Sequence, residues 1–147
     1  MHVKRIDHVG IAVADVAAAK RLYEDLLGLT LTREEVVSDQ GVRTYFYPIA
    51  GVKLELLEST TPDGPIARHL EKRGPGMQHL AVEVDDIEAA IAELKGKGVR
   101  MLDETPRKGV EDTRIAFVHP KDTHGVLLEL VELPKGRSPQ GGQVTAG

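Results

Sequence analysis

The sequence contains no cysteine. Disulfide bonds, thiolate metal ligands and a thiol nucleophile are therefore excluded, and any bound metal must be held by nitrogen and oxygen atoms. The sequence also lacks any run of about 18 consecutive apolar residues, the length that spans a membrane. Residues 1–5 lead directly into a predicted strand, without the apolar core of a signal peptide. We therefore expect a cytoplasmic protein with no membrane partner.

An excess of basic residues is also missing. The 19 lysines and arginines are outnumbered by 23 acidic residues, which gives a formal net charge of −4. Nucleic acid selects for a basic surface, so we expect no nucleic-acid partner. No glycine-rich phosphate-binding loop precedes a predicted helix, and a dinucleotide cofactor is therefore not expected either.

The sequence does contain an internal repeat. Residues 8–19 recur as residues 79–90, at a constant offset of 71 residues. In both copies a histidine opens an alternating apolar stretch, an aspartate closes it, and an alanine pair follows. A second echo relates Leu54-Glu55-Leu56 to Leu128-Glu129-Leu130, at an offset of 74 residues. A repeat of this length indicates one structural unit that is used twice.

The periodicity of the apolar residues predicts the same order of elements in both halves. In the first half the predicted elements are a strand at 6–14, a helix at 15–27 and strands at 29–37, 42–49 and 52–58. In the second half they are a strand at 78–84, a helix capped by Asp85 or Asp86, and strands at 99–102, 113–119 and 125–132. A short linker helix is predicted after Pro65.

These elements predict an α+β fold. Two pseudo-symmetric βαβββ modules, at about residues 4–60 and 77–133, form one open, cup-like mixed sheet in a single domain of residues 1–133. Residues 134–147 have the composition of a flexible tail. The paired modules leave sheet edges that a second subunit can cover, so a homodimer is expected.

Each module carries one histidine and one glutamate at matching places, namely His8 with Glu55 and His79 with Glu129. Each glutamate lies between leucines in an apolar strand, where an uncompensated buried carboxylate costs several kcal/mol. One alternative is that the strands are reversed, with the glutamates in solvent. The joint pattern favours a shared site, because internal symmetry brings two imidazoles and two carboxylates around one divalent cation, such as cobalt, manganese, nickel or zinc.

Several motifs in register with these four residues carry a resemblance to a known family. They are Asp7-His8-Val9-Gly10-Ile11, Gln40-Gly41-Val42-Arg43, Lys53-Leu54-Glu55-Leu56-Leu57, Gln78-His79-Leu80-Ala81, His119-Pro120-Lys121 and Gly125-Val126-Leu127-Leu128-Glu129. With them the sequence resembles the vicinal oxygen chelate superfamily and, within it, the methylmalonyl-CoA epimerase family. The resemblance covers nearly all of residues 5–132.

The resemblance implies one divalent metal ion per chain, with cobalt as the leading candidate, held by His8, Glu55, His79 and Glu129. It also implies a small acyl-CoA substrate and an epimerase that interconverts (R)- and (S)-methylmalonyl-CoA through a metal-stabilised enolate. Inversion at the reacting carbon requires acid/base groups on opposite faces of the planar enolate. Glu55 and Glu129 are the leading pair.

One position departs from the family pattern. Some members carry a glutamate two residues after the Gln-Gly-Val motif, where this chain has Thr44. A threonine hydroxyl is too weak an acid to act as the second base. The candidates for the second proton carrier are therefore Glu55, a water on the metal, and an ordered water near Thr44 and Gln40.

Gln40, Arg43, Thr44 and Lys121 are the predicted substrate-binding residues. The positive charges of Arg43, Lys53 and Lys121 make these three side chains candidates for binding the substrate carboxylate or the CoA phosphates.

Three other functions are open. A glyoxalase I-type lactoylglutathione lyase uses the same metal site on a different substrate. An extradiol-type dioxygenase would use His8, His79 and Glu129 as an iron triad, but Glu55 as a fourth ligand disfavours it, because oxygen and a catechol need open positions. A non-catalytic ligand-binding protein of the same fold needs no metal.

Overall fold

A computed structural model describes residues 1–137. These residues form two compact units, and strand β1 contributes to both. One unit comprises residues 1–8 and 79–137, and the other comprises residues 9–78. Of the predicted tail, residues 138–147 lie outside the described residues. In the described part, the amide of Arg137 donates to the carbonyl of Pro134 at 3.1 Å, which closes a turn.

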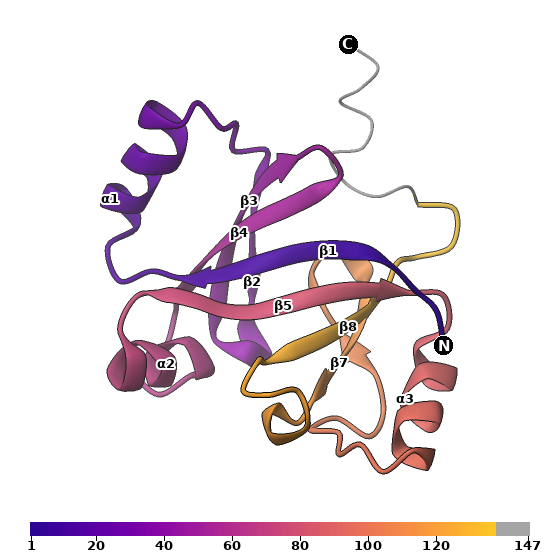
Figure 1. The fold of residues 1–147 in the computed structure, drawn as a ribbon. Coiled ribbons are helices and arrows are strands. Elements are labelled where there is room, and N and C mark those ends of the chain that lie inside the picture. The colour runs from indigo at the N-terminus through magenta and orange to yellow at the C-terminus, as the bar shows by residue number, and fades with distance from the viewer. Residues whose placement is uncertain (138–147) are drawn as a thin grey trace. The chain divides into compact units, whose positions relative to one another are not determined.

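Each half of the sequence forms the predicted order of elements (Figure 1). The first half contains β1 (Val3–Ala12), α1 (Val16–Lys20), β2 (Arg33–Val37), β3 (Val42–Ile49) and β4 (Val52–Ser59). The second half contains β5 (Gly76–Val84), α3 (Ile87–Gly96), β6 (Arg107–Lys108), β7 (Arg114–Val118) and β8 (Leu128–Glu132). Helix α2 (Pro65–Arg73) is the predicted linker helix, and the α+β fold class is confirmed.

Four short helical segments complete the described chain. They are η1 (Arg21–Leu26), η2 (Ser38–Gln40), η3 (Val110–Asp112) and η4 (Pro120–Asp122). No helix within residues 1–137 combines the length and the apolar character that crossing a membrane demands.

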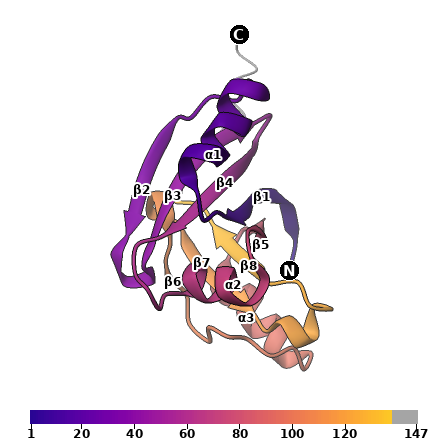
Figure 2. The same ribbon diagram turned by 90° about the vertical axis from the view of Figure 1, so that its left-hand side faces the viewer.

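In the unit of residues 9–78 the strand order is β2-β3-β4-β1, and both β2 with β3 and β3 with β4 are antiparallel. Figure 2 shows α1 in front of β3 and β4. There Val16, Ala19 and Tyr23 pack against Tyr47 and Leu56. The predicted helix at 15–27 is regular only as far as Lys20 and continues as the wider π-type turns of η1.

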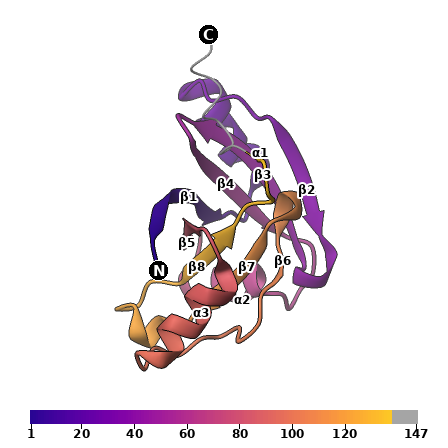
Figure 3. The same cartoon turned by 90° about the vertical axis from the view of Figure 1, so that its right-hand side faces the viewer.

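In the unit of residues 1–8 and 79–137 the strand order is β1-β5-β8-β7-β6. Strands β5 and β8 are parallel, whereas β8 with β7 and β7 with β6 are antiparallel. Helix α3 lies across one face of these strands (Figure 3) and buries Ile87, Ala90 and Ile91 against Val118 and Leu130. The side chains of the candidate site lie on the opposite face of these strands.

Both helix caps lie at the repeated aspartates. Asp15 Oδ1 accepts from the amide of Ala18 at 3.0 Å, and Asp86 Oδ1 accepts from the amide of Ala89 at 3.0 Å. Of the two predicted caps of the second helix, Asp86 is therefore the correct one.

The predicted strand at 99–102 is wrong. Only Met101 forms an isolated bridge, with Val118, and the edge strand β6 lies further along the chain. Backbone hydrogen bonds from His119 to Arg100 and from Leu102 to Phe117, both at 2.9 Å, flank this bridge. At the next residue Asp103 Oδ2 accepts from the amide of Phe117 at 2.8 Å, so a side chain ends the pairing there.

Candidate metal centre

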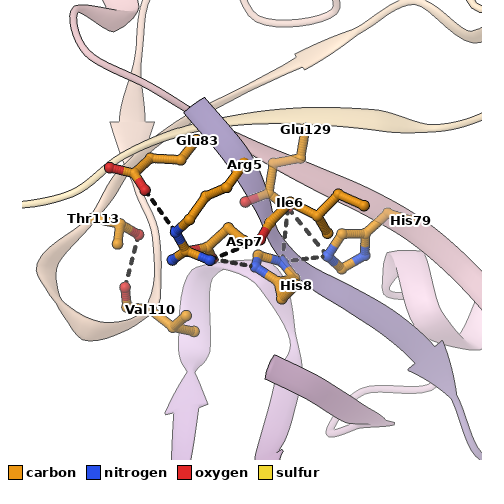
Figure 4. Close-up of polar contacts among 9 residues, drawn as sticks. All are labelled: Arg5, Ile6, Asp7, His8, His79, Glu83, Val110, Thr113 and Glu129. Carbon is orange, nitrogen blue, oxygen red and sulfur yellow. Dashed lines mark hydrogen bonds and ion pairs between the residues drawn. The ribbon is translucent and has the colours of Figure 1, made fainter. Parts of the chain in front are cut away.

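Three of the four predicted ligands come together in the unit of residues 1–8 and 79–137. Side chains alternate along a strand, so His79 and Ala81 share one face of β5. Ala81 pairs with Glu129 on the parallel strand β8, which puts Glu129 on the same face. His8 comes from the segment of β1 that belongs to this unit. Figure 4 shows the side chains of His8, His79 and Glu129 pointing toward one another.

The spacing of the three donor atoms fits a divalent cation. His8 Nε2 lies 2.9 Å from His79 Nε2, and Glu129 Oε1 lies 3.1 Å from His79 Nε2 and 3.5 Å from His8 Nε2. Ligands bound at about 2.1 Å and separated by about 90–110° lie about 3.0–3.4 Å apart. The two imidazole rings are nearly perpendicular, at 87°, which lets both Nε2 atoms face the same point. These three buried residues could therefore hold a metal ion from one side.

The surroundings of Glu129 favour its ionised form. Its side chain is buried, and burial alone raises the pKa of a carboxyl group. The nearby imidazoles of His8 and, to a smaller extent, of His79 outweigh this effect and lower the pKa of Glu129 below its ordinary value. Glu129 is therefore a carboxylate at neutral pH, available as a ligand or as a base.

His79 is a neutral imidazole at neutral pH. Burial lowers its pKa to about 4, although attraction to Glu129 acts in the opposite direction, and repulsion from His8 lowers the pKa further. Phe117 lies on β7, opposite Glu129 on β8. Its ring packs edge-on against the His79 ring at a centroid distance of 5.9 Å. A neutral imidazole keeps the lone pair that a metal ligand needs.

We expect the metal-free protein to lose stability as the pH falls from about 6.5 to about 4. An unfolded histidine takes up its proton near pH 6.5, whereas His79 in the folded protein does so only near pH 4. The unfolded state binds more protons within this window, so the free energy of unfolding falls with falling pH. Urea unfolding of chelator-treated protein at a series of pH values measures the effect. The variant His79→Gln should show a weaker pH dependence, and an unchanged slope in that variant would contradict the assignment.

A buried carboxylate next to the His8 ring was not predicted from the sequence. Asp7 is 1% exposed, and its Oδ2 lies 2.7 Å from His8 Nδ1. Its other oxygen accepts from Arg5 Nη2 at 2.9 Å, and Arg5 Nε donates to Glu83 at 2.9 Å (Figure 4). Neighbouring side chains on a strand normally point to opposite faces, so strand periodicity gives no signal for this contact.

Glu55 lies in the other unit, where it is 2% exposed on β4 and pairs with Phe46 on β3. The alternative that the glutamates point into solvent is therefore wrong for Glu55, and the burial of Glu129 rules it out there too. The role of Glu55 as a fourth ligand and as a base stays a prediction. Lys53, on the same face of β4, is also buried rather than exposed, and its ammonium lies 6.0 Å from the centre of the Phe46 ring.

The predicted substrate-binding residues Arg43 and Thr44 are neighbours on β3 with different surroundings. Thr44 is buried, whereas Arg43 is partly exposed and forms ion pairs with Glu34 at 3.5 Å and with Glu58 at 3.7 Å. Because the two side chains alternate across the strand, the role predicted for each of them has to be tested separately.

Gln40 ends the short helix η2 and precedes Gly41, whose φ is 63°. A Cβ at Gly41 would approach Thr61 Oγ1 to 2.9 Å, so this turn requires glycine. Gln40 Nε2 is buried and has no hydrogen-bond acceptor among the described residues. A buried amide donor of this kind suits a ligand oxygen.

Lys121 lies in η4 and is exposed. Its backbone amide donates to His119 Nδ1 at 3.1 Å, which fixes the start of this turn. The histidine of the His-Pro-Lys motif thus caps a helical turn, and the lysine side chain is left at the surface.

Comparisons with known proteins support the resemblance. A family model described as Glyoxalase/Bleomycin resistance protein/Dioxygenase superfamily matches residues 7–117. The mitochondrial methylmalonyl-CoA epimerase of Homo sapiens is 39% identical over 127 residues, which cover 86% of this chain and 72% of that protein.

Solved structures of epimerases match closely as well. The methylmalonyl-CoA epimerase of Mycobacterium tuberculosis has a TM-score of 0.85 at 41% identity, covering 99% of this chain and 93% of that one. A variant of the Streptomyces coelicolor methylmalonyl-CoA epimerase, in complex with 2-nitronate-propionyl-CoA, has a TM-score of 0.88 at 40% identity, covering 94% and 100%. The chain therefore belongs to the glyoxalase/bleomycin resistance protein/dioxygenase superfamily and is a homologue of its methylmalonyl-CoA epimerases.

Proposed function

We propose that this protein is a divalent-metal-dependent epimerase that interconverts (R)- and (S)-methylmalonyl-CoA. The observation that carries the proposal is the buried set of His8, His79 and Glu129, whose donor atoms have the mutual spacing of metal ligands. The homologous epimerases support the acyl-CoA substrate class. The donor set of two imidazoles and one or two carboxylates suits divalent cobalt, manganese, nickel or zinc, and the family resemblance makes cobalt the leading candidate.

The chemistry of the substrate explains why such a site is needed. The hydrogen to be moved lies on C2, between a thioester and a carboxylate, so its removal leaves an enolate. A divalent cation, when bound, supplies the positive charge that stabilises the enolate oxygens. His8 and His79 serve to hold the cation, and their burial keeps water away from the reacting groups.

Glu129 is proposed as the general base on one face of the substrate. It is ionised at neutral pH and buried, and it has two oxygens, so one can bind the cation while the other takes the proton. Its Oε1 faces both imidazoles, which suits the ligand role for that atom.

The proton carrier for the opposite face is proposed to be Glu55. It is the buried carboxylate of β4, and Thr44 stands where some relatives have a glutamate. An ordered water held by Thr44 and Gln40 is the alternative. The buried Nε2 donor of Gln40 suits an oxygen of the substrate, while the charges of Arg43 and Lys121 suit the CoA phosphates.

Deuterium exchange at C2 of methylmalonyl-CoA tests the proposal. Protein purified without chelator, incubated with substrate in D2O, is expected to incorporate deuterium at C2 and to convert one epimer into the other, more rapidly with added Co²⁺. Mass spectrometry follows the exchange, and substrate without protein gives the spontaneous rate. Absence of metal-dependent exchange would refute the epimerase. Formation of lactoylglutathione from methylglyoxal and glutathione would instead support the glyoxalase alternative.

A further inference from the structure

We propose that Asp7 is a positioning residue for the metal centre, and that it holds His8 in the tautomer with a hydrogen on Nδ1 and a lone pair on Nε2. The inference rests on the proposed function, because it assigns Asp7 a role toward the metal ligand His8. In this role Asp7 acts through the candidate ligand His8 and does not contact the substrate.

The first step of the argument is the short contact between the two side chains. Asp7 Oδ2 lies 2.7 Å from His8 Nδ1, and both residues are buried. A carboxylate can only accept hydrogen bonds, so the ring nitrogen must donate. With its hydrogen on Nδ1, a neutral imidazole has its lone pair on Nε2, the atom that faces His79 and Glu129.

The second step is that Asp7 is itself held in place. Arg5 Nη2 donates to Asp7 Oδ1 at 2.9 Å, so one oxygen of the carboxylate faces a guanidinium and the other faces His8. Arg5 in turn donates from Nε to Glu83 Oε1 at 2.9 Å, and Lys4 lies 3.4 Å from the other oxygen of Glu83. Figure 4 shows Arg5 between Glu83 and Asp7, with His8 on the far side of Asp7.

The third step comes from the internal repeat. At the offset of 71 residues that relates His8 to His79, the counterparts of Arg5, Asp7 and Glu83 are Gly76, Gln78 and Ala12. All three charged residues have uncharged counterparts in the other copy, so the repeat as such does not account for this network. It distinguishes His8, which has an anion behind its ring, from His79, whose ring packs against Phe117.

The variant Asp7→Asn tests the tautomer directly. Asparagine has the same shape but only one accepting oxygen, and Arg5 can only donate. The amide oxygen is therefore expected to face Arg5, which leaves the amide NH2 facing His8 Nδ1. That ring nitrogen must then accept, so the ring hydrogen moves to Nε2 and blocks the metal-binding lone pair. Because partners behind a ligand of this kind contribute about 10- to 100-fold to metal affinity, we expect Co²⁺ affinity to fall by that factor.

Two measurements follow the effect in the metal-free and the Co²⁺-bound protein. Titration with Co²⁺, followed by its visible absorption and by calorimetry, gives the affinity. Long-range ¹⁵N NMR of the metal-free protein at neutral pH reports which ring nitrogen of His8 carries the hydrogen, with the His8 signals identified by their loss in His8→Gln. The matched control is Asp86→Asn, which makes the same change of charge in the same unit at a helix cap that asparagine also fills. It should bind Co²⁺ as tightly as the parent protein.

The outcomes separate this inference from the proposed function. If Asp7→Asn binds Co²⁺ as tightly as the parent, or if the parent protein itself carries the His8 hydrogen on Nε2, the role of Asp7 is refuted while epimerisation can still be observed. The second of these readouts needs no Asp7 variant and holds even if Asp7→Asn does not fold. If the double variant Arg5→Met/Asp7→Asn recovers part of the affinity lost in the single variant, the inference is supported, because the amide can then rotate. If the parent binds no Co²⁺, this inference and the metal-dependent function both fail.

Discussion

Replacing Glu129 by glutamine is expected to lower the turnover of methylmalonyl-CoA by at least about a hundredfold while the fold stays intact. Glutamine fills the same volume in a buried position on β8, but an amide cannot take up the C2 proton. The lowered pKa of Glu129 keeps it a carboxylate at neutral pH, which is the form that can accept the C2 proton. Turnover at saturating Co²⁺, together with C2 exchange in D2O, measures the loss.

The conditions of this assay decide which role Glu129 has. Weaker metal binding with normal turnover at high Co²⁺ would leave Glu129 as a ligand only and remove it as a base. The matched control is Glu132→Gln, three residues further along the same strand. Glu132 pairs with Arg114 and caps α3 through the amide of Ile87. This control is expected to keep turnover within about twofold of the parent, because Glu132 contacts Arg114 and Ile87 rather than any of the three clustered residues, and the one accepting oxygen of glutamine can keep the bond from Ile87.

The internal repeat explains why so much of the site was predictable. Both copies of the module carry a histidine at the same place and a glutamate in a matching apolar strand. These four residues are candidate ligands because of their matching places in the repeat rather than because of their local sequence. The structure brings His8, His79 and Glu129 together as this reasoning requires. The burial of Glu55 agrees with the same pattern.

The features that were not predicted depend on single side chains. These side chains either replace a backbone hydrogen-bond partner or do not follow the alternation of apolar and polar residues along a strand. The side chain of Asp103 accepts from the amide of Phe117, so the pairing with β7 ends soon after the bridge at Met101. Asp7 contacts the ring of its own neighbour, although alternation places adjacent side chains on opposite faces. Lys53 is buried in spite of its charge. Periodicity describes which face is apolar, and it contains no information about such polar exceptions.

Two of these polar exceptions, Asp7 and Asp103, lie in the unit that holds His8, His79 and Glu129. Arg5, Asp7 and Glu83 form a chain of charge-assisted hydrogen bonds that ends at His8. A buried charge is tolerated only where it is paired, so such a chain is costly to form incompletely. This chain of hydrogen bonds favours one orientation of the His8 ring.

Removal of the divalent metal is expected to reduce C2 exchange by at least about a thousandfold, because a cation contributes several kcal/mol to the stabilisation of the enolate. Dialysis against a chelator, followed by return of Co²⁺, should abolish and then restore the activity. Binding also has a readout independent of activity: free Co²⁺ at about 100 times its dissociation constant should stabilise the folded protein by about 2.7 kcal/mol. His8→Gln should lose this stabilisation, whereas His119→Gln, which lies outside the three-residue site, should retain it. If thermal unfolding of the parent protein is unaffected by Co²⁺, the close approach of the two imidazoles and the carboxylate must serve the fold instead of a metal.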